Sequence, residues 1–218
     1  MSGIGQLGGG CILGLASYRR SVSETKRAAI LKAARENFLN GGYSRAAMAD
    51  IARDADVSTA TLYKHFASKD ALFAAIVEDA CTTINNLMPT DIKGQGVGVR
   101  EVLRRFADAY VEQQFDHRMN ELLRVVIAEV PTAPHLANAV YNDGVLARYE
   151  QLRTTLDVLV ERGDLKSHNT HDGALHLGGM VKEFVVWPAL FSSRFEKPAD
   201  LDAKIDSCID AYLKIYGN

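Results

Sequence analysis

Apolar residues recur along this chain with the spacing of amphipathic helices, and sustained runs of alternating polarity are almost absent. The segment 24–40 is a clear example, because its apolar residues share one helical face and Gly41-Gly42 follow it as a stop signal. The residues on that face are Ile30, Leu31, Ala34 and Phe38. The chain is therefore predicted to be all-α, with about nine helices.

Two short helices and a longer one are predicted to follow this first helix. They run over 47–55, from Ser58 to about Phe66, and from Ser68 to just before Pro89. Ser58 and Ser68 have side chains that cap helix N-termini, and Asp56-Val57 form the turn between the short helices. Two short helices joined by a tight turn, after a longer helix, are typical of a helix-turn-helix.

The rest of the chain is predicted to form five further helices, over 99–117, 119–130, 134–162, 170–191 and 201–216. Gly144 and Pro188 are expected to distort the third and the fourth of these. The helix over 170–191 is apolar around most of its circumference, which indicates burial on more than one side.

Composition indicates a globular protein, and its charges are unevenly distributed. The 218 residues are 47% hydrophobic and carry a formal net charge of -2, so the chain can bury a core. Residues 19–70 nevertheless contain ten Lys and Arg against six Asp and Glu, whereas residues 71–218 contain 15 against 21. This asymmetry favours an anionic partner for the first part alone.

Cysteines and apolar runs favour a cytoplasmic protein. Cys11, Cys81 and Cys208 form no CxxC pair, so neither a disulfide framework nor a zinc site is expected. No apolar run approaches the roughly 20 residues of a membrane span. The run 11–16 is followed, rather than preceded, by arginines, which is the reverse of a signal peptide. Residues 1–20 are expected to form a flexible tail because of their glycines.

The residue string around the two short helices resembles the DNA-binding region of the tetracycline-repressor (TetR) family of bacterial regulators, over about residues 24–77. The matching residues are Gly42-Tyr43, Asp50-Ile51-Ala52, Ala55, Val57-Ser58, Thr61-Leu62-Tyr63, His65-Phe66 and Ser68-Lys69-Asp70-Ala71-Leu72. The resemblance implies a helix-turn-helix domain over 21–68 and a ligand-binding and dimerisation domain over 69–218. The chain departs from the family at Ala46-Ala47, where a hydroxyl residue is usual, and at Asp56, where Gly is usual.

In a helix-turn-helix the second short helix enters the major groove, and residues near its N-terminus meet base edges. Thr59, Ala60 and Thr61 hold these positions here, and none of them is a bidentate base reader. The resemblance implies phosphate contacts for the residues that follow. The full set of candidate DNA-binding residues is Lys26, Arg27, Ala47, Met48, Thr59, Ala60, Thr61, Tyr63, Lys64, His65 and Lys69. Arg19 and Arg20 are expected either to enter the minor groove as an arm or to lie in a disordered tail.

The C-terminal segment looks like the AcrR/AefR-like branch of the same family. This resemblance implies a ligand pocket among the fifth to eighth helices and a dimer formed by the last two helices. Candidate ligand contacts are Phe106, Tyr110, Arg124, Tyr141, His176, Glu183 and Trp187. Candidate interface residues are Gly178, Gly179, Val181, Val185, Ile205, Ile209 and Tyr212.

The resulting hypothesis is a homodimeric, ligand-responsive regulator, usually a repressor in this family. It would leave a palindromic operator when a small apolar or amphipathic molecule binds. No cofactor and no membrane partner are expected, and no motif of a hydrolase, a phosphate loop, a dinucleotide site or a zinc protease occurs in the sequence. His168, His171 and His176 are residue types that bind metals, but their position favours exposed residues at a helix start. The alternative is a helical enzyme or small-molecule carrier that retains a helix-turn-helix scaffold.

Overall fold

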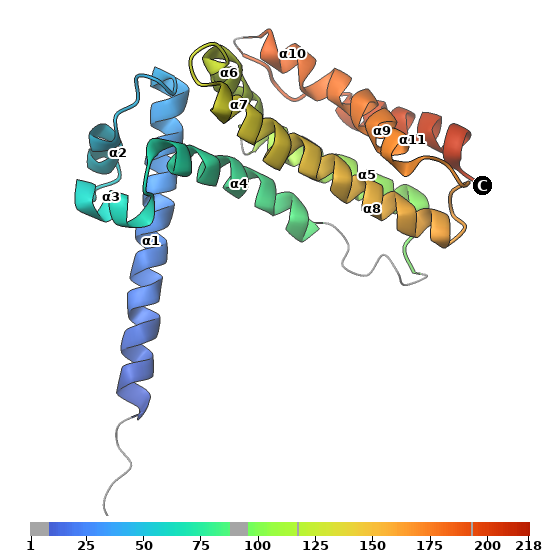
Figure 1. Cartoon of the computed structure of the whole chain (residues 1–218). Helices are drawn as coiled ribbons and strands as arrows, with labels where there is room; N and C mark the ends of the chain where they lie inside the picture. Colours follow the sequence, from blue (N-terminus) through green and yellow to red (C-terminus); the bar gives the residue numbers. More distant parts are fainter. Residues whose placement is uncertain (1–8, 88–95, 117, 193) are drawn as a thin grey trace, which may run out of the picture. The chain divides into compact units, whose positions relative to one another are not determined.

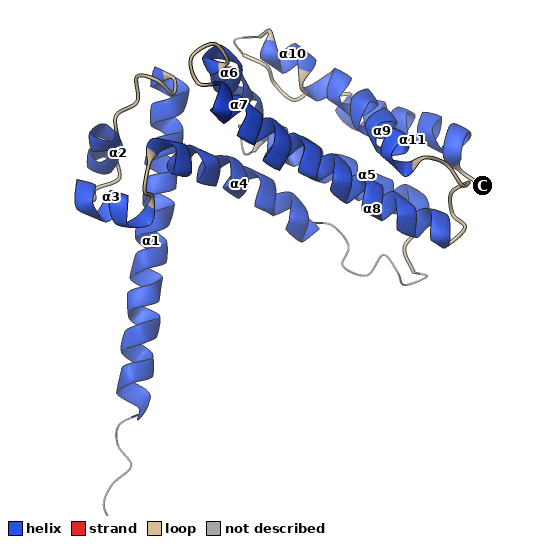
Figure 2. Cartoon of the chain, viewed as in Figure 1, coloured by secondary structure: helices blue, strands red, loops and turns tan. Residues whose placement is uncertain are grey.

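The structure is a computed structural model that describes residues 9–87, 96–116, 118–192 and 194–218 (Figure 1). Most of these residues are helical, and no strand occurs among them beyond one isolated bridge between Leu165 and Gly217 (Figure 2). The prediction of an all-α chain is therefore confirmed. None of the described helices is long and apolar enough to cross a membrane.

The chain divides into two compact units that meet between Ile76 and Val77. This division falls within α4 (Lys69–Leu87), whereas the sequence suggests a boundary at 68/69. The smaller unit contains α1 (Gly9–Gly41), α2 (Met48–Asp54) and α3 (Thr59–His65). Because α1 begins well before the expected start at Glu24, the backbone at Arg19 and Arg20 is helical rather than an irregular arm.

Three aromatic rings form the centre of the smaller unit. The ring of Phe38 stacks on Tyr43 with centroids 5.5 Å apart, and its edge meets Phe73 at 5.2 Å. Tyr43 and Phe73 pack edge to face at 5.4 Å. Phe38 lies on α1, Tyr43 in the following loop and Phe73 at the start of α4, so this cluster fixes the helices that surround α2 and α3.

The turns and caps of the smaller unit follow the sequence closely. Asp56 adopts a left-handed backbone with φ of 53°, which a short polar side chain tolerates better than most. The Ser58 Oγ accepts a hydrogen bond from the Thr61 N–H at 3.1 Å, and the Ser68 Oγ accepts one from the Ala71 N–H at 3.0 Å. Ala47, at the N-cap of α2, makes no side-chain cap, as its lack of a hydroxyl predicts.

The larger unit continues with α5 (Val99–Phe115), α6 (Met119–Glu129), α7 (Pro134–Ala139), η1 (Val140–Leu146), α8 (Ala147–Glu161), α9 (Thr170–Val185), α10 (Trp187–Leu190) and α11 (Leu201–Tyr216). The long helix predicted over 134–162 is thus divided by η1, a π-helix that contains Gly144. The helix predicted over 170–191 is divided before Pro188, which occupies the first turn of α10.

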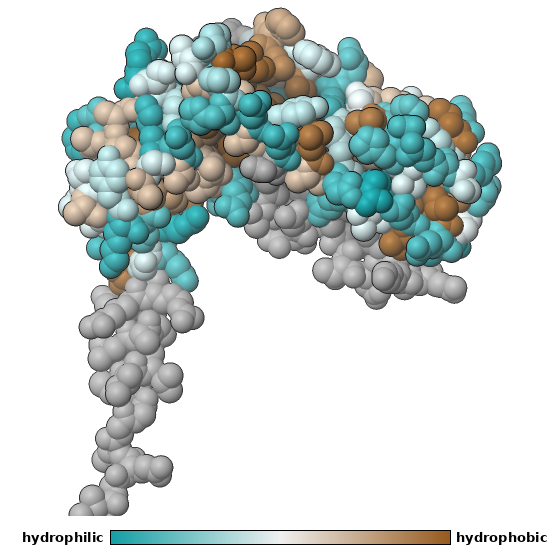
Figure 3. All heavy atoms as spheres, in the orientation of Figure 1, coloured by the Kyte–Doolittle hydropathy of each residue, from teal (hydrophilic) through white to brown (hydrophobic). Residues whose placement is uncertain are grey.

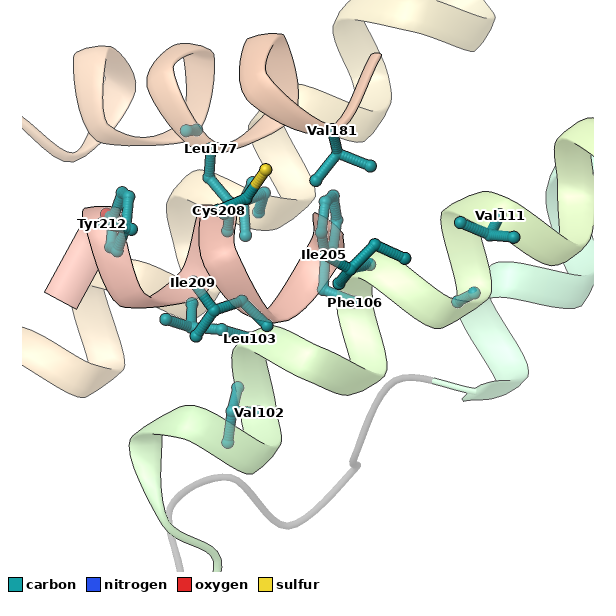
Figure 4. Packing of buried hydrophobic residues seen from close by; sticks show 14 of the residues in the cluster. Val102, Leu103, Phe106, Val111, Leu177, Val181, Ile205, Cys208, Ile209 and Tyr212 are labelled. Carbon is teal, nitrogen blue, oxygen red and sulfur yellow. The ribbon is translucent and has the colours of Figure 1, made fainter. Parts of the chain in front are cut away.

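The core of the larger unit lies where α5, α8, α9 and α11 pack together, as Figure 4 shows for residues of α5, α9 and α11. Val181 and Val185 on α9 are 2% and 0% exposed, and Ile205, Ile209 and Tyr212 on α11 are between 0% and 1% exposed. We expected these five residues at a dimer interface. That assignment is wrong, because a single protomer already buries them.

Ion pairs join α5 to α11 at the edge of this core. The Arg104 guanidinium binds Asp202 at 2.7 Å and Asp206 at 3.0 Å on α11, and it binds Asp108 at 2.8 Å on its own helix. Arg100 on α5 pairs with Asp210 in the same way. These contacts set the register of α11 along α5.

Candidate DNA-binding helices and ligand cavity

The helix α3 presents a polar face to solvent and an apolar face to the core. Leu62 is 0% exposed and anchors the helix, whereas Tyr63 is 50% exposed and Lys64 is also exposed. Thr59 and Ala60, in the first turn, are also exposed. A short helix held by one buried leucine, with an aromatic and a cationic side chain outside, suits contact with a groove and its phosphates.

Thr61 is less accessible than its neighbours Thr59 and Ala60. Its hydroxyl lies 2.8 Å from the Ser58 Oγ, and its N–H donates to the same atom. The Thr61 hydroxyl therefore takes part in the N-terminal cap of α3, a role that competes with the base contact expected from the sequence.

Lys69 differs from the phosphate-binding role that we expect from the sequence. Its ammonium donates to the carbonyl oxygens of Tyr43 at 2.9 Å, Ser44 at 3.2 Å and Ala46 at 3.2 Å. The same ammonium lies 4.5 Å from the centroid of the Tyr43 ring. An ammonium has three N–H donors, and all three are occupied, so Lys69 ties the loop between α1 and α2 to the start of α4.

Arg27 lies beside the C-terminal end of α3. Its guanidinium is over the Phe66 ring, 5.3 Å from the centroid, and Phe66 is the C-cap residue of α3. Arg27 and Lys26 are both exposed on α1. The structure thus brings Arg27 to the same end of α3 as Lys64 and His65, which are the last two residues of that helix.

A second candidate site is a cavity of about 400 Å³ that lies wholly within the larger unit. Its volume is in the range of sites for small organic molecules. Aliphatic and aromatic side chains form most of the wall, which comprises Val77, Phe106, Tyr110, Gln113, Gln114, Met119, Leu123, Val126, Ile127, Val130, Ala137, Val140, Tyr141, Gly144, Val145, Arg148, Tyr149, Gly178, Val181, Lys182, Val186, Trp187 and Leu190. The π-helix η1 supplies Val140, Tyr141, Gly144 and Val145, in keeping with the frequent occurrence of π-helices at functional sites.

A small polar group interrupts the apolar wall of the cavity. The Gln113 Oε1 accepts hydrogen bonds from the Arg148 guanidinium and, at 3.3 Å, from the Gln114 Nε2. Gln113 and Gln114 are 1% and 3% exposed. Arg148 also lies over the Tyr110 ring, 5.6 Å from its centroid. Burial raises the pKa of the Tyr110 hydroxyl above its ordinary value, so this group stays protonated and able to donate.

Sequence profiles assign both parts of the chain. The profile of "Bacterial regulatory proteins, tetR family" matches residues 30–76, and that of "AefR-like transcriptional repressor, C-terminal domain" matches residues 101–218. The chain belongs to the TetR family. The regulators of this family, as a class, are not enzymes.

Solved structures of transcriptional regulators match the chain over most of its length. One is a TetR-family transcriptional regulator of Mesorhizobium loti MAFF303099, 27% identical, with a TM-score of 0.76 over 90% of this chain and 98% of that one. Another is the flavonoid-responsive regulator FrrA, 26% identical, with a TM-score of 0.69 over 88% of this chain and 97% of that one.

Curated relatives match over shorter stretches. The activator FasR of Mycolicibacterium smegmatis is 36% identical over 99 residues, which are 43% of this chain and 40% of that protein. The regulator UidR of Escherichia coli K12 is 44% identical over 55 residues, which are 25% of this chain and 28% of that protein. The chain therefore spans less than half the length of these relatives.

The cavity of this TetR-family chain includes four of the seven expected ligand residues, namely Phe106, Tyr110, Tyr141 and Trp187. Arg124, His176 and Glu183 are not among the described lining residues, so the cavity does not support their predicted role. Arg124 instead donates to the carbonyl oxygens of Ala189 at 2.9 Å and Ser192 at 2.6 Å. The His176 Nδ1 lies 2.6 Å from the Tyr216 hydroxyl.

Sequence reasoning missed the polar part of the cavity, which comprises Gln113, Gln114, Arg148 and Lys182. The signal for it was weak, because glutamines, arginines and lysines on helices usually face solvent. A pair of glutamines on the buried side of α5 was the only sign in the sequence. In the described ranges no group of three His, Cys, Asp or Glu is arranged to hold a metal ion.

Gly178 and Gly179 have different surroundings. A Cβ added at Gly178 would lie 2.7 Å from the Tyr149 Cε1, so Gly178 gives room to a cavity side chain within one protomer. Nothing lies within 4 Å of a Cβ added at Gly179, which is exposed. Gly179 is therefore the more accessible of the two to a second protomer.

Proposed function

We propose that the protein is a DNA-binding transcriptional regulator that acts in the cytoplasm and controls genes by binding an operator as a homodimer. The exposed face of α3 carries this proposal, because Tyr63 and Lys64 project from a helix whose other side is fixed by buried Leu62. The match of residues 30–76 to the TetR profile supports the same role. Arg27, at the end of the same helix, adds a cation suited to a phosphate.

Two substitutions on α3 test this role in fluorescence anisotropy with duplex DNA. Lys64→Ala should weaken binding to specific and random DNA alike and lower the salt slope by about one unit, as the loss of one phosphate contact does. Tyr63→Ala should also weaken binding to DNA. It should leave the salt slope unchanged, because the Tyr63 side chain carries no charge. Lys197→Ala, which alters an exposed lysine in the loop before α11, is the matched control. Normal binding by both α3 variants would refute the assignment of α3 as the reading helix.

We further propose that the exposed faces of α9 and α11 form the homodimer. Leu175 on α9 is 41% exposed and Ile215 on α11 is 59% exposed. Gly179 lies one turn beyond Leu175 on the same helix, and small residues let two helices approach closely. Gly179→Arg should therefore yield a monomer in sedimentation velocity experiments. Gly96→Arg, at an exposed glycine that also has open space around it, should leave the dimer intact.

The cavity is proposed as the effector site, and the protein as a repressor that the effector releases. FrrA is named as flavonoid-responsive, and a compact aromatic effector of that kind suits the aromatic wall of this cavity. Val77 lines the cavity and belongs to α4, the helix that begins at Lys69. α4 is proposed as the chain segment through which ligand binding affects DNA binding, because Lys69 at its start ties the loop before α2.

Effector release requires that the ligand bind the DNA-incompetent conformation more tightly. By linkage, operator DNA must then weaken ligand binding by the same factor, typically about 5–150-fold. Titrating apigenin, a hydroxylated flavone, into the protein with and without DNA tests this reciprocity. Equal affinities in the two titrations would show that this compound is not an effector.

A further inference from the structure

One face of α5 lines the cavity, and it changes from aromatic to polar along the helix. Phe106, Tyr110, Gln113 and Gln114 are all lining residues, and their spacing of three or four positions places them on the same helical face. Apolar side chains usually occupy such a face, because an amide that is buried without a hydrogen-bond partner is unfavourable. The two glutamines in the last turn of α5 are therefore the unusual part of this wall.

The two glutamines differ in their hydrogen bonds. The Gln113 Oε1 accepts from the Arg148 guanidinium and, at 3.3 Å, from the Gln114 Nε2. The Gln114 Oε1 has no hydrogen-bond partner among the described residues. Gln114 is 3% exposed, and an unpaired acceptor in such surroundings costs free energy. Gln114 therefore has an acceptor to offer to a ligand in the cavity.

The Gln114 amide can turn towards the cavity at little cost. The torsion that rotates the terminal amide of a glutamine is broad rather than confined to narrow staggered wells. Turning the amide gives up the bond from its Nε2 to the Gln113 Oε1, which is weak at a length of 3.3 Å. The Gln114 oxygen can thus reach a donor on the ligand without breaking the contact between Gln113 and Arg148.

A hydrogen-bond donor lies one helical turn before Gln114. Tyr110 precedes it by four residues on α5, and no described residue forms a hydrogen bond with the Tyr110 hydroxyl. Burial raises the pKa of this hydroxyl above its ordinary value, so it stays protonated and able to donate. A hydroxyl on a ligand both donates and accepts, and it therefore matches an acceptor and a donor on one face better than a group that only accepts.

The opposite character is found where the cavity meets solvent. Ile127, Tyr141 and Trp187 line the cavity and are 55%, 56% and 55% exposed. The surface drawn in Figure 3 is mostly hydrophilic and carries a few apolar patches, so large exposed apolar side chains are the exception on it. The cavity has a buried polar part and an apolar rim, which suits a mainly apolar molecule with one polar group at its inner end.

We propose that the cavity selects apolar molecules that carry a hydroxyl group, and that Gln114 recognises this group by accepting its hydrogen. This inference rests on the proposed role of the cavity as the effector site. It goes further, because it names the functional group of the ligand and the residue that determines specificity for it.

Three probes that share an apolar ring system test this specificity, namely 2-naphthol, 2-methoxynaphthalene and naphthalene. Binding is measured by isothermal titration calorimetry at pH 7, where a phenolic hydroxyl keeps its proton. 2-Methoxynaphthalene retains an oxygen that accepts hydrogen bonds but has no O–H donor, so its comparison with 2-naphthol isolates the donor. The wild-type protein should bind 2-naphthol at least about tenfold more tightly than the two others, as one hydrogen bond to an otherwise unpaired acceptor predicts.

Gln114→Met should reduce the preference for 2-naphthol over 2-methoxynaphthalene to near one. Its affinity for naphthalene should not fall, which shows that the cavity is intact. Gln114→Glu keeps acceptor oxygens on a side chain of the same length and should retain the preference. Gln151→Met is the matched control, since Gln151 is a glutamine of α8 that is not among the described lining residues. Its preference should equal that of the wild type.

Equal binding of 2-naphthol and 2-methoxynaphthalene by the wild type, or a preference that survives Gln114→Met, would overturn the inference. The same holds if 2-naphthol does not bind. DNA binding by the same preparations, with and without 2-naphthol, is measured separately by anisotropy. A hydroxyl preference without any effect on DNA affinity supports the ligand class and refutes the effector role of the cavity, whereas failure of the protein to bind DNA refutes the proposed function.

Discussion

Replacing Lys69 by methionine separates a structural lysine from one that binds phosphate. The substitution keeps most of the apolar stem and removes the ammonium that donates to the carbonyls of Tyr43, Ser44 and Ala46. Tyr43 and Ala46 are 6% and 8% exposed, so their carbonyls lose a partner in buried surroundings. Ser44 is exposed, and its carbonyl can bind water instead.

The expected loss follows mainly from the Ala46 carbonyl, because the Tyr43 carbonyl still accepts from the Ala46 N–H at 3.3 Å. One unpaired carbonyl costs about 1–3 kcal/mol, so Lys69→Met should lower the free energy of unfolding by about 1–3 kcal/mol. A loss of about 2 kcal/mol lowers the Tm of a chain of this size by roughly 4–8 °C. Urea titration and thermal melting, both followed by circular dichroism, measure the two quantities.

The control is Lys64→Met, because Lys64 is exposed on α3 and should change stability by no more than about 0.5 kcal/mol. The two variants should also differ in DNA binding. Lys64→Met should lower the salt slope by about one unit, and Lys69→Met should leave it unchanged. A Lys69→Met protein with wild-type stability and a lowered slope would refute the structural role and restore the phosphate contact.

Three further substitutions test other parts of the larger unit. Gly178→Ala should displace the Tyr149 ring, which lines the cavity and lies 2.7 Å from the added Cβ. The affinity for apigenin should fall while sedimentation still shows a dimer, and a monomer would contradict this. Arg104→Met should lower the free energy of unfolding by about 1–2 kcal/mol, because it breaks the ion pairs with Asp202 and Asp206. In 1 M salt the variant and the wild type should differ less in this free energy. Arg105→Met is the control, because its partner Glu101 lies on the same helix. The Arg118 guanidinium holds the pKa of Glu121 below its ordinary value. The ion pair therefore stabilises the folded state above about pH 4.3, and this stabilisation is lost as the pH falls through the lower folded pKa. In acid the Tm of Glu121→Gln should fall less steeply than that of the wild type, and parallel curves of Tm against pH would contradict the pairing.

Much of the fold follows from local patterns that the sequence contains. The caps at Ser58 and Ser68, the left-handed Asp56 and the break before Pro188 all depend on residues adjacent in the chain. The π-helix η1 was expected only as a kink at Gly144, because π-helices are rare and no local sequence signal announces one.

The candidate sites were harder to predict, because the sequence does not show whether an apolar side chain packs within its own protomer or against a second one. The apolar face of α11 is evident from its period, but period alone does not show whether Ile205 and Ile209 meet their own chain or a partner. Lys69 matches the family at its position, yet its role depends on three carbonyls that only the folded loop brings together. Arg148 looks like an ordinary surface charge until Gln113 and Tyr110 are placed beside it.

The central claim is that α3 reads an operator sequence, and one measurement tests it most directly. Fluorescence anisotropy of the wild-type protein should be recorded with the DNA upstream of its own gene and with a random duplex of equal length, at the same physiological salt concentration. The account predicts that the upstream DNA binds at least about 10³-fold more tightly, as specific regulators do. Equal affinity for the two duplexes at that salt concentration would contradict it.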